Sequence, residues 1–196
     1  MGSIFSSGYP HIGFEEYLFK AERSEEKLEY FQGLVYAMAG GSQFHSAITM
    51  NIAFALMSRL KNTSCRVMSS DQMIETPSQE AAYYPDLSVV CQDKLLPRLK
   101  SITTPTAVIE VLSPSTRSYD LETKLKQYRR IPSLRHIVFA DSQSVEVILY
   151  SRGENEVWPG EPERFTQLAE NLLLPALNIE IPVQEVYSGL DMDAVN

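Results

Sequence analysis

The chain has 196 residues, of which 44% are hydrophobic and 21% are charged, and its formal net charge is −8. This length suits one domain that buries roughly 70% of its unfolded surface. No apolar run approaches the roughly 20 residues that a membrane span requires. Residues 1–8 lack the basic stretch and apolar core of an export signal. We therefore expect a single domain over residues 1–196 in the cytoplasm, with no membrane contact.

The negative charge is concentrated near the C-terminus. Residues 146–196 carry ten acidic and two basic residues, whereas residues 1–145 carry 15 of each. Within the balanced part, residues 117–135 hold six Lys and Arg residues against two acidic ones. A local cationic patch can steer a phosphate backbone even on an acidic protein. Residues 117–135 are therefore expected to form either such a patch or a solvated helix face.

Several enzyme classes leave no motif in this sequence. It contains no GxSxG, no Gly-rich phosphate loop and no HExxH. Its two cysteines, Cys65 and Cys91, form no CxxC or other metal-ligand spacing. Because each lies in an expected strand, we predict two buried, unreactive thiols in a reducing cytoplasm.

In chain order, the first expected elements are a helix, a hairpin and a long helix. Apolar residues at i, i+3, i+4 and i+7 predict a short helix over residues 13–24. Two apolar runs within residues 27–38 flank Gln-Gly at 32–33, a pattern typical of a β-hairpin. Ser42 follows two glycines and is placed to cap a helix that runs to about Lys61.

The rest of the chain alternates strands with one further helix. Strands are expected at about 65–75, 84–91, 106–112, 134–140 and 145–150. A loop is expected around Asp93 to Pro105, and a helix from about Ser118, its N-cap, to Arg130. The acidic remainder suits a hairpin, an extended segment and a short terminal helix. This order predicts one mixed α/β domain.

Two carboxylates occupy strand positions where acids are unusual. Glu110 lies inside the apolar run 106–112, and Asp86 follows Pro85 at a strand start. A buried unpaired carboxylate costs several kcal/mol, roughly, so each needs a partner. A shared divalent cation would serve both, and such a cation usually performs phosphate chemistry. The alternatives are a strand-end turn for Asp86 and a buried ion pair with Arg or Lys for Glu110.

Lys124 lies on the helix expected after the Glu110 strand. It borders a packing stripe of Leu121, Leu125 and Tyr128, so its ammonium could reach back over the sheet toward the carboxylates. Two carboxylates and a main-chain carbonyl suit Mg²⁺, and the lysine would orient the attacking water or stabilise the reacting phosphate. The alternative is a surface lysine paired with Asp120 at i, i+4.

Four other residues are candidates for the same site. Glu29 is either a third acid or a solvated hairpin residue. His45, at the start of the long helix, could contact phosphate or orient a carboxylate, or it could be a cap or core residue. Asp71 could face the same cleft, although structural hydrogen bonding accounts for it better. Tyr128 is expected to pack, with its hydroxyl available to hold the site.

Several of these motifs occur together in one known family. Pro85-Asp86, the run Glu-Val-Leu-Ser-Pro-Ser-Thr at 110–116 and the helix 120–128 resemble the putative restriction endonuclease family abundant in cyanobacteria. That family belongs to the PD-(D/E)XK nuclease superfamily. The resemblance extends through residues 24–30, 36–41, His45 and 173–175, so it covers nearly the whole chain.

The resemblance implies an α/β (α+β) restriction-endonuclease-like fold, with a central mixed sheet flanked by helices. It also implies cleavage of DNA phosphodiester bonds with Mg²⁺, or with Mn²⁺ as a substitute. By position, Asp86, Glu110 and the Val111 carbonyl would bind the metal. The superfamily lysine normally stands two residues after the second acid, where this chain has Leu112, and its counterpart in this family is Lys124. Many superfamily nucleases are dimers, so the analogy also implies a homodimer.

The chain departs from the family pattern at the hairpin. The family tends to carry acids at positions 32 and 34, where this chain has Gln32 and Leu34, although Glu29 remains. These departures favour an alternative function, a catalytically decayed module of the same fold that binds nucleic acid or protein. A third possibility is a structural or toxin–antitoxin-like interaction protein, which predicts an exposed apolar patch.

Overall fold

A computed structural model of the chain describes residues 11–38, 40–91, 101–153 and 155–195. Residues 1–8 and residues 93–100 of the expected loop lie outside this described part. None of the helices in the described part is long and apolar enough to cross a membrane.

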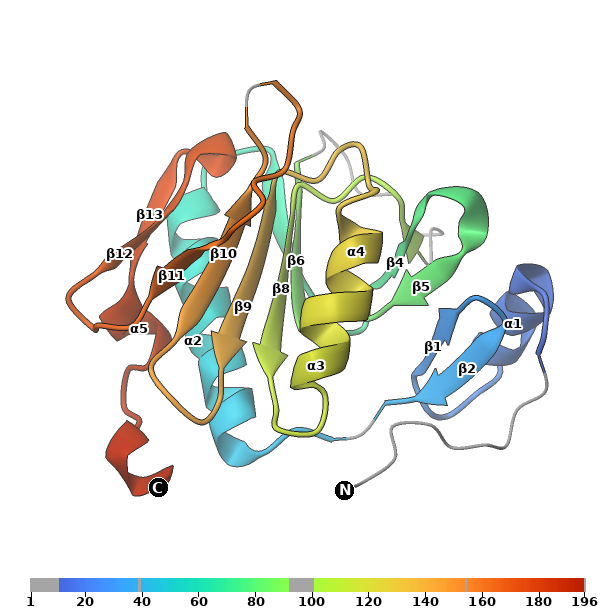
Figure 1. The fold of residues 1–196 in the computed structure, drawn as a ribbon, viewed down its shortest axis with the longest axis horizontal. Helices are drawn as coiled ribbons and strands as arrows, with labels where there is room; N and C mark the ends of the chain where they lie inside the picture. Colours follow the sequence, from blue (N-terminus) through green and yellow to red (C-terminus); the bar gives the residue numbers. More distant parts are fainter. Residues whose placement is uncertain (1–10, 39, 92–100, 154, 196) are drawn as a thin grey trace.

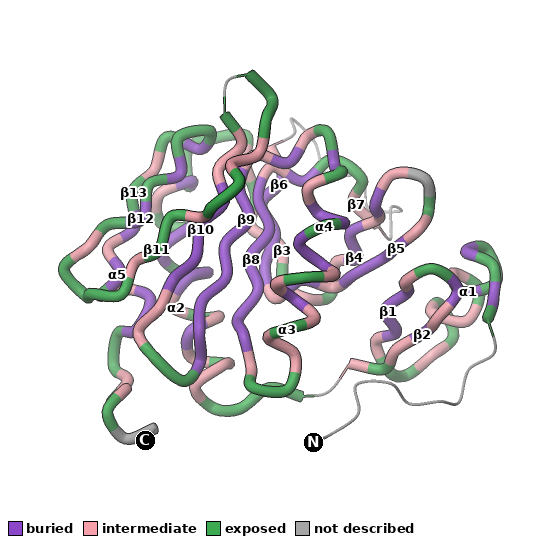
Figure 2. The backbone as a smooth tube through the Cα atoms, in the orientation of Figure 1, coloured by how far each residue is buried: buried purple, intermediate pink, exposed green. Residues whose placement is uncertain are grey.

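A six-stranded sheet forms the centre of the molecule, in the order β11-β10-β9-β8-β6-β3 (Figure 1). Its β8–β9 pair is parallel and its other neighbouring pairs are antiparallel, which confirms the predicted mixed sheet. Strands β8 and β9 are buried along their whole length, as a sheet covered on both faces requires (Figure 2). The strands are β3 (Cys65–Ser69), β6 (Leu87–Cys91), β8 (Ala107–Leu112), β9 (His136–Asp141), β10 (Val147–Ser151) and β11 (Glu163–Phe165).

Helices cover both faces of this sheet. One face packs against α2 (Gln43–Leu60), the hairpin β12 (Asn171–Leu174) and β13 (Ile179–Pro182), and α5 (Val183–Val186). The other face packs against one helical segment made of α3 (Arg117–Tyr119), the π-helical turn η2 (Asp120–Lys124) and α4 (Leu125–Tyr128).

Strand β8 alternates between these two layers. Ile109 and Val111 belong to the core on the α2 side, whereas Val108 and Leu112 belong to the core on the α4 side. Because successive side chains of a strand point to opposite faces, Glu110 faces the layer of α3, η2 and α4.

A second, smaller sheet lies beside that helical layer, in the order β2-β1-β5-β4-β7. Its hairpin turns at Gln32 and Gly33, whose φ angles of 46° and 91° fit the two-residue turn predicted for this sequence. The strands of this smaller sheet are β1 (Leu28–Phe31), β2 (Leu34–Ala37), β4 (Met73–Glu75), β5 (Ala81–Tyr83) and β7 (Ser101–Ile102). Helix α1 (Phe14–Ala21) precedes them in the chain. Short 3-10 turns occupy Pro77–Gln79, Pro175–Leu177 and Met192–Val195.

The N-terminal predictions are confirmed, two later ones are wrong in detail, and one strand was not predicted. Ser42 caps α2 by accepting a hydrogen bond from the His45 N–H. The strand predicted over 65–75 is two strands, β3 and β4, in different sheets, because the chain turns between Ser69 and Gln72. Strand β5 was not predicted. The helix predicted to begin after Ser118 begins at Arg117 instead.

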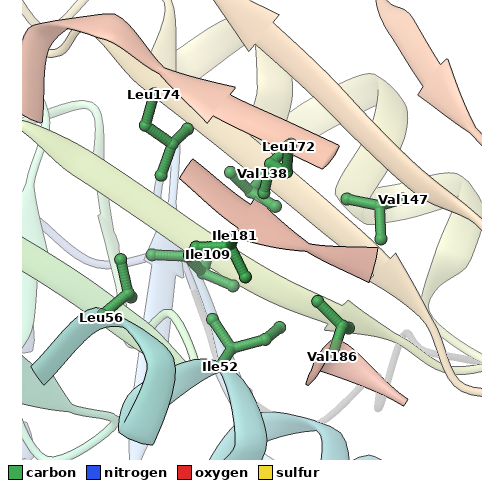
Figure 3. Close-up of a pocket in the computed structure, with 9 residues that line it drawn as sticks. All are labelled: Ile52, Leu56, Ile109, Val138, Val147, Leu172, Leu174, Ile181 and Val186. Atoms are coloured by element: carbon green, nitrogen blue, oxygen red, sulfur yellow. The ribbon is translucent and has the colours of Figure 1, made fainter. Parts of the chain in front are cut away.

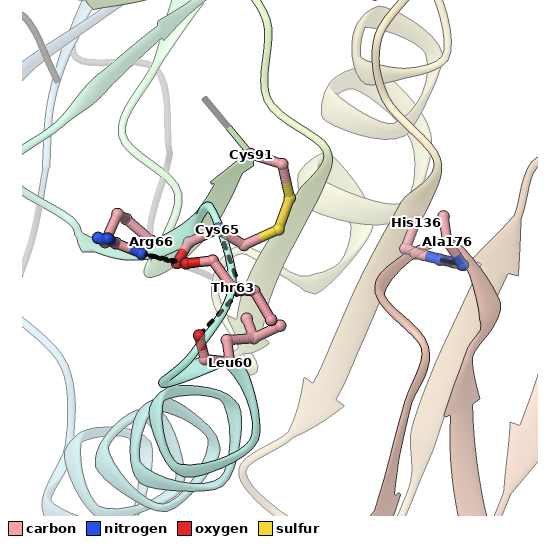
Figure 4. Close-up of a disulfide and its surroundings, with 7 residues drawn as sticks. All are labelled: Leu60, Thr63, Cys65, Arg66, Cys91, His136 and Ala176. Atoms are coloured by element: carbon pink, nitrogen blue, oxygen red, sulfur yellow. Dashed lines mark hydrogen bonds between the residues drawn. A yellow bond between two sulfur atoms is a disulfide. The ribbon is translucent and has the colours of Figure 1, made fainter. Parts of the chain in front are cut away.

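The prediction of two free, buried thiols is wrong. Cys65 and Cys91 form a disulfide between β3 and β6, and both residues are only partly buried (Figure 4). The antiparallel register of these strands places Cys65 directly opposite Cys91. Strand propensity locates each cysteine but not this register, so the sequence pattern alone could not reveal the pairing.

An apolar cavity lies inside the core on the α2 side. Its volume is about 10 Å³, barely the size of a water molecule, and only aliphatic side chains line it (Figure 3). It therefore offers no ligand site. Its lining residues are Ile52, Leu56, Ile109, Val138, Val147, Leu172, Leu174, Ile181 and Val186.

Candidate active site

Asp86 and Glu110 meet at one end of the β6–β8 pair. The antiparallel register places Leu87 opposite Ile109. Asp86, which precedes Leu87, therefore lies beside Glu110, which follows Ile109. The backbone N–H of Val111 donates a 2.7 Å hydrogen bond to Oδ2 of Asp86. Two acids 24 residues apart in the sequence are thus held together by the pairing of their strands.

Lys124 lies at the centre of three buried carboxylates. Its Nζ is 3.1 Å from Oε1 of Glu29, 3.1 Å from Oε1 of Glu110 and 3.5 Å from Oδ1 of Asp120. None of these four side chains exposes more than 8% of its surface. Lys124 does pair with Asp120 at i, i+4, as the alternative interpretation held, but it is not a surface residue.

The π-helical turn accounts for the direction of two of these side chains. Asp120 and Lys124 are the first and last residues of η2, and both are buried. A wide turn inside an α-helix changes which side chains face inward, and such turns are frequent at functional sites. Here it directs an acid and a lysine of one helical segment toward Glu110.

Glu110 is held by two donors. The Tyr128 hydroxyl donates a 2.6 Å hydrogen bond to Oε1 of Glu110, and Lys124 donates to the same oxygen. Burial, assisted by the nearby carboxylates of Asp120 and Asp86, raises the pKa of Glu110 to about 8 despite the opposing effect of Lys124. Tyr128 packs and holds the site with its hydroxyl, as predicted.

The charges of this cluster do not balance. Burial by itself would lower the pKa of Lys124, yet Glu110, Glu29 and Asp120 raise it well above its ordinary value. Burial raises the pKa of Asp120 despite the neighbouring ammonium of Lys124. Three buried carboxyl groups therefore share one ammonium, and when all three are ionised the cluster can accept additional positive charge.

Glu29 connects the smaller sheet to this cluster. It lies on β1 and exposes only 6% of its surface, so it is not the solvated hairpin residue of the alternative interpretation. Its Oε1 accepts a 3.0 Å hydrogen bond from the backbone N–H of Tyr84, two residues before Asp86. Glu29 thereby fixes the segment that carries Asp86.

His45 lies on the outer side of Asp86. Its Nε2 is 3.3 Å from Oδ2 of Asp86, and both side chains are partly exposed. The hydrogen bond to Asp86 raises the pKa of His45 against the effect of burial, and a hydrogen bond to the Val111 backbone raises it as well. A Cβ added to Gly41 would lie 2.6 Å from Nδ1 of His45, so this ring position requires glycine at 41.

Asp71 does not join the cluster. Its side chain is 82% exposed and pairs with Lys27 at 2.8 Å. This surface ion pair agrees with the structural interpretation of Asp71 rather than with a place in the cleft.

Residues 117–135 do not form a free cationic face. Four of their six basic side chains are paired with carboxylates: Arg117 with Asp141 and Glu146, Lys124 in the buried cluster, Arg130 with Glu80, and Arg135 with Glu156. Arg129 donates to the Pro159 carbonyl. These contacts oppose the interpretation of the segment as a patch that steers phosphate.

Asp120 is the site residue that sequence reasoning missed. It was interpreted only as a favourable charge near a helix N-terminus and as a surface partner of Lys124. Its spacing of four residues before Lys124 and eight before Tyr128 placed all three on one helix face. The burial of that face was not readable from the spacing.

The donor set fits a small divalent cation, although no cage of side chains is present. In the described part of the chain, no three His, Cys, Asp or Glu side chains converge as a metal-binding group. Mg²⁺ usually keeps several waters and needs only one or two carboxylates, so Asp86, Glu110 and the Val111 carbonyl match its chemistry. The surplus of buried carboxylates over Lys124 is the feature of this structure that fits added positive charge.

The mixed central sheet, with acids at one end of two neighbouring inner strands and a lysine from the adjoining helix, defines the restriction-endonuclease-like class of fold. The family described as "Putative restriction endonuclease" (Uma2) matches residues 14–184, and the chain belongs to this family.

Two proteins of Synechocystis sp. are similar to this chain in sequence. The uncharacterized protein slr1290 is 35% identical over 185 residues, which cover 94% of this chain and 96% of that protein. The uncharacterized protein sll1609 is 28% identical over 145 residues, which cover 73% of this chain and 82% of that protein.

A solved structure shares the fold. The crystal structure of a "putative nuclease belonging to DUF820" from Anabaena variabilis superposes with a TM-score of 0.74. The match covers 90% of this chain and 98% of the other, at 19% sequence identity. At this identity the likeness establishes the fold alone, and it confirms the predicted restriction-endonuclease-like architecture.

Proposed function

We propose that the protein is a Mg²⁺-dependent endonuclease that hydrolyses DNA phosphodiester bonds, with Mn²⁺ as a possible substitute. The observation that carries this proposal is the hydrogen bond from the Val111 N–H to Asp86, which holds Asp86 beside Glu110, the acid that Lys124 contacts. Membership in a family of nuclease description supports the reaction class. A cytoplasmic location remains part of this proposal, and the Cys65–Cys91 disulfide, of a kind rare in that compartment, counts against it.

Asp86, Glu110 and the Val111 carbonyl would hold the metal. A divalent cation bound there would act as a Lewis acid on the phosphodiester and would lower the pKa of a coordinated water. His45 orients Asp86, while Tyr128 orients Glu110. Lys124 supplies a fixed positive charge toward the reacting phosphate, and Glu29 and Asp120 hold its ammonium in place.

The departure at Gln32 does not remove an acid from the cluster. Gln32 lies at the turn, and its side chain hydrogen-bonds Glu80 rather than any cluster residue. Glu29 and Asp120 supply two further buried acids beside Lys124. This arrangement supports an active site more than a decayed one.

The alternative remains a non-catalytic module of the same fold. It is favoured by the paired basic residues of the 117–135 segment and by the lack of a three-side-chain metal group in the described part. In that case Lys124 is the permanent counterion of Glu110, and the cluster need not bind a metal.

The decisive experiment combines cleavage with metal binding. Supercoiled plasmid is incubated with the wild-type protein and Mg²⁺ or Mn²⁺, beside Asp86→Asn and Glu110→Gln variants. Calorimetric titration with Mn²⁺ measures binding separately. Asp71→Asn is the matched control, because Asp71 is an exposed acid outside the cluster.

We expect metal-dependent nicking by the wild type and by Asp71→Asn, and none by the two cluster variants. Mn²⁺ binding without nicking would support the decayed module. An absence of both, or nicking that survives both cluster substitutions, would overturn the proposed site.

A further inference from the structure

Helix α2 presents an apolar stripe to solvent. Met50, Phe54 and Met57 expose 63%, 74% and 60% of their surfaces. Their spacing of four and three residues places them on one helix face, called here the α2 stripe. Helix α2 carries three of the seven large hydrophobic side chains that are exposed in the described part of the chain.

The opposite face of α2 is already used. Ile48, Ile52 and Leu56 are buried in the core against the central sheet. From Gln43 to Ser58 the helix has no Asp, Glu, Lys or Arg, so it is free of these charges around its whole circumference there. An apolar helix stripe is normally covered, and in an isolated copy of this chain Met50, Phe54 and Met57 remain uncovered.

We propose that the α2 stripe is the interface of a symmetric homodimer, in which two α2 helices pack antiparallel and cross at Phe54. The stripe is nearly symmetric about Phe54, with one methionine four residues before it and another three residues after it. An antiparallel copy therefore sets Phe54 against Phe54 and Met50 against Met57. Such self-complementarity is what a two-fold interface requires.

The charges favour a second copy over nucleic acid. A phosphate backbone is bound by Lys and Arg, and the stripe offers neither. Two copies that each carry a net charge of −8 repel one another least where the contact surface is uncharged. The α2 stripe is apolar and carries no Lys, Arg, Asp or Glu, so copies can associate through it without bringing like charges together.

The size of the stripe sets the expected strength of the dimer. Its three side chains expose on the order of 350 Å² per copy, under half of the roughly 800 Å² that each partner buries in a stable interface. Flanking residues must supply the remainder. The dimer is consequently expected to dissociate on dilution, in the micromolar range.

This arrangement also relates the two candidate active sites. His45 precedes Phe54 by nine residues, about 13 Å along a helix. The antiparallel pair therefore holds the two His45 residues on opposite sides of the two-fold axis, separated by about 27 Å along the helix direction. The dimer itself does not depend on whether the sites cleave DNA.

Sedimentation velocity over a wide range of protein concentration tests the interface. The wild type should pass from the monomer mass of 22.1 kDa toward twice that mass as concentration rises. Phe54→Glu should remain a monomer at every concentration, because it places two like charges at the crossing point. The matched control is Phe19→Glu, a phenylalanine 57% exposed on α1 outside the stripe, which should associate as the wild type does.

A second variant tests the contact directly and does not rely on loss of association. Oxidised Phe54→Cys should form a covalent dimer that reducing agent separates, whereas Phe19→Cys should not. A wild type that stays monomeric at all concentrations would overturn the proposal. So would association that survives Phe54→Glu, or a dimer whose Phe54→Cys form does not cross-link.

Discussion

Oδ2 of Asp86 accepts a 2.7 Å hydrogen bond from the backbone N–H of Val111, the residue that follows Glu110. The side chain of Asp86, just before β6, is thereby hydrogen-bonded to the backbone of β8. The separation of Asp86 and Glu110 is consequently set by sheet pairing rather than by flexible side chains. A site held this way is organised before any substrate arrives, as metal and phosphate chemistry require.

Removing the central ammonium should destabilise the fold. Lys124→Met leaves Glu29, Glu110 and Asp120 buried without their shared cation, a change that costs about 3–5 kcal/mol of unfolding free energy. The loss should grow as pH rises from about 4 toward neutrality, because the orphaned carboxyl groups stay protonated in the folded state while they ionise in the unfolded state. Urea denaturation measures it, with Lys126→Met, an exposed neighbour, as control. An equal loss in both variants would contradict this account.

Metal affinity should depend on pH through Glu110. With its pKa raised to about 8 by burial, Glu110 is protonated at neutral pH, and metal must displace that proton. Affinity for Mn²⁺ should therefore rise about tenfold per pH unit below pH 8 and level off above it. Calorimetry in buffers of different ionisation enthalpy measures the number of protons released when Mn²⁺ binds. Glu110→Gln should bind weakly with no such slope, and pH-independent binding by the wild type would refute the expectation.

The ring of His45 should respond to a single methyl group at Gly41. An added Cβ would lie 2.6 Å from Nδ1 of His45, so Gly41→Ala must push the ring away from Asp86. The raised pKa of His45 should then fall back toward its ordinary value, because the hydrogen bond to Asp86 sustains it. NMR titration of the histidine ring protons measures the shift. Gly40→Ala has open space around it and should leave the pKa unchanged.

Buried His136 should make the fold sensitive to acid. Its Nε2 accepts a hydrogen bond from the Ala176 N–H (Figure 4), and burial lowers its pKa to about 4. An unfolded histidine binds a proton near pH 6.5, so the native state gains its full stability above that pH.

About 3 kcal/mol of this stability should be lost as pH falls from about 6.5 to 4. His136→Gln should be less stable at neutral pH but should lack this His136-linked part of the pH dependence. His11→Gln, a change at an exposed residue, should titrate as the wild type does. Identical pH profiles for all three proteins would contradict the assignment.

Loss of the disulfide should lower stability without moving the candidate site. Cys65 and Cys91 are separated by 26 residues in sequence, and closing a loop of this length stabilises by about 3 kcal/mol in the chain-entropy description. Denaturation of the Cys65→Ser/Cys91→Ser double variant measures this loss, and thiol titration of the unfolded wild type without reductant should find none. Two free thiols per chain would contradict the disulfide.

Elements with strong local signals were predicted correctly. The hairpin follows from Gln32-Gly33, and α2 begins where Ser42 can accept a hydrogen bond from His45. Elements that depend on their neighbours were not. Strand β5 is Ala-Ala-Tyr, which has little intrinsic strand preference and exists because it pairs with β1 and β4. The turn between β3 and β4 was not predicted, because residues 65–75 were interpreted as one continuous strand.

The candidate site shows the same division. The sequence indicated Asp86 and Glu110 because acids are unusual at strand positions, and it indicated Lys124 because the next helix carries it. These signals come from neighbouring residues in the sequence. Asp120 and the burial of Glu29 were missed because both depend on how the helical segment and the smaller sheet pack together. The pairing of the basic residues in 117–135 likewise depends on partners up to 50 residues away in sequence.

By itself, the sequence determined which side chains carry chemistry, where most helices and strands lie, and which family the chain resembles. The tertiary structure decided the rest: which acids share Lys124, that Cys65 faces Cys91, and that Phe54 is left uncovered. The physical reason is the range of the interactions. Periodicity, capping and turn chemistry act over a few residues, whereas burial, charge pairing and strand register arise only when distant segments meet.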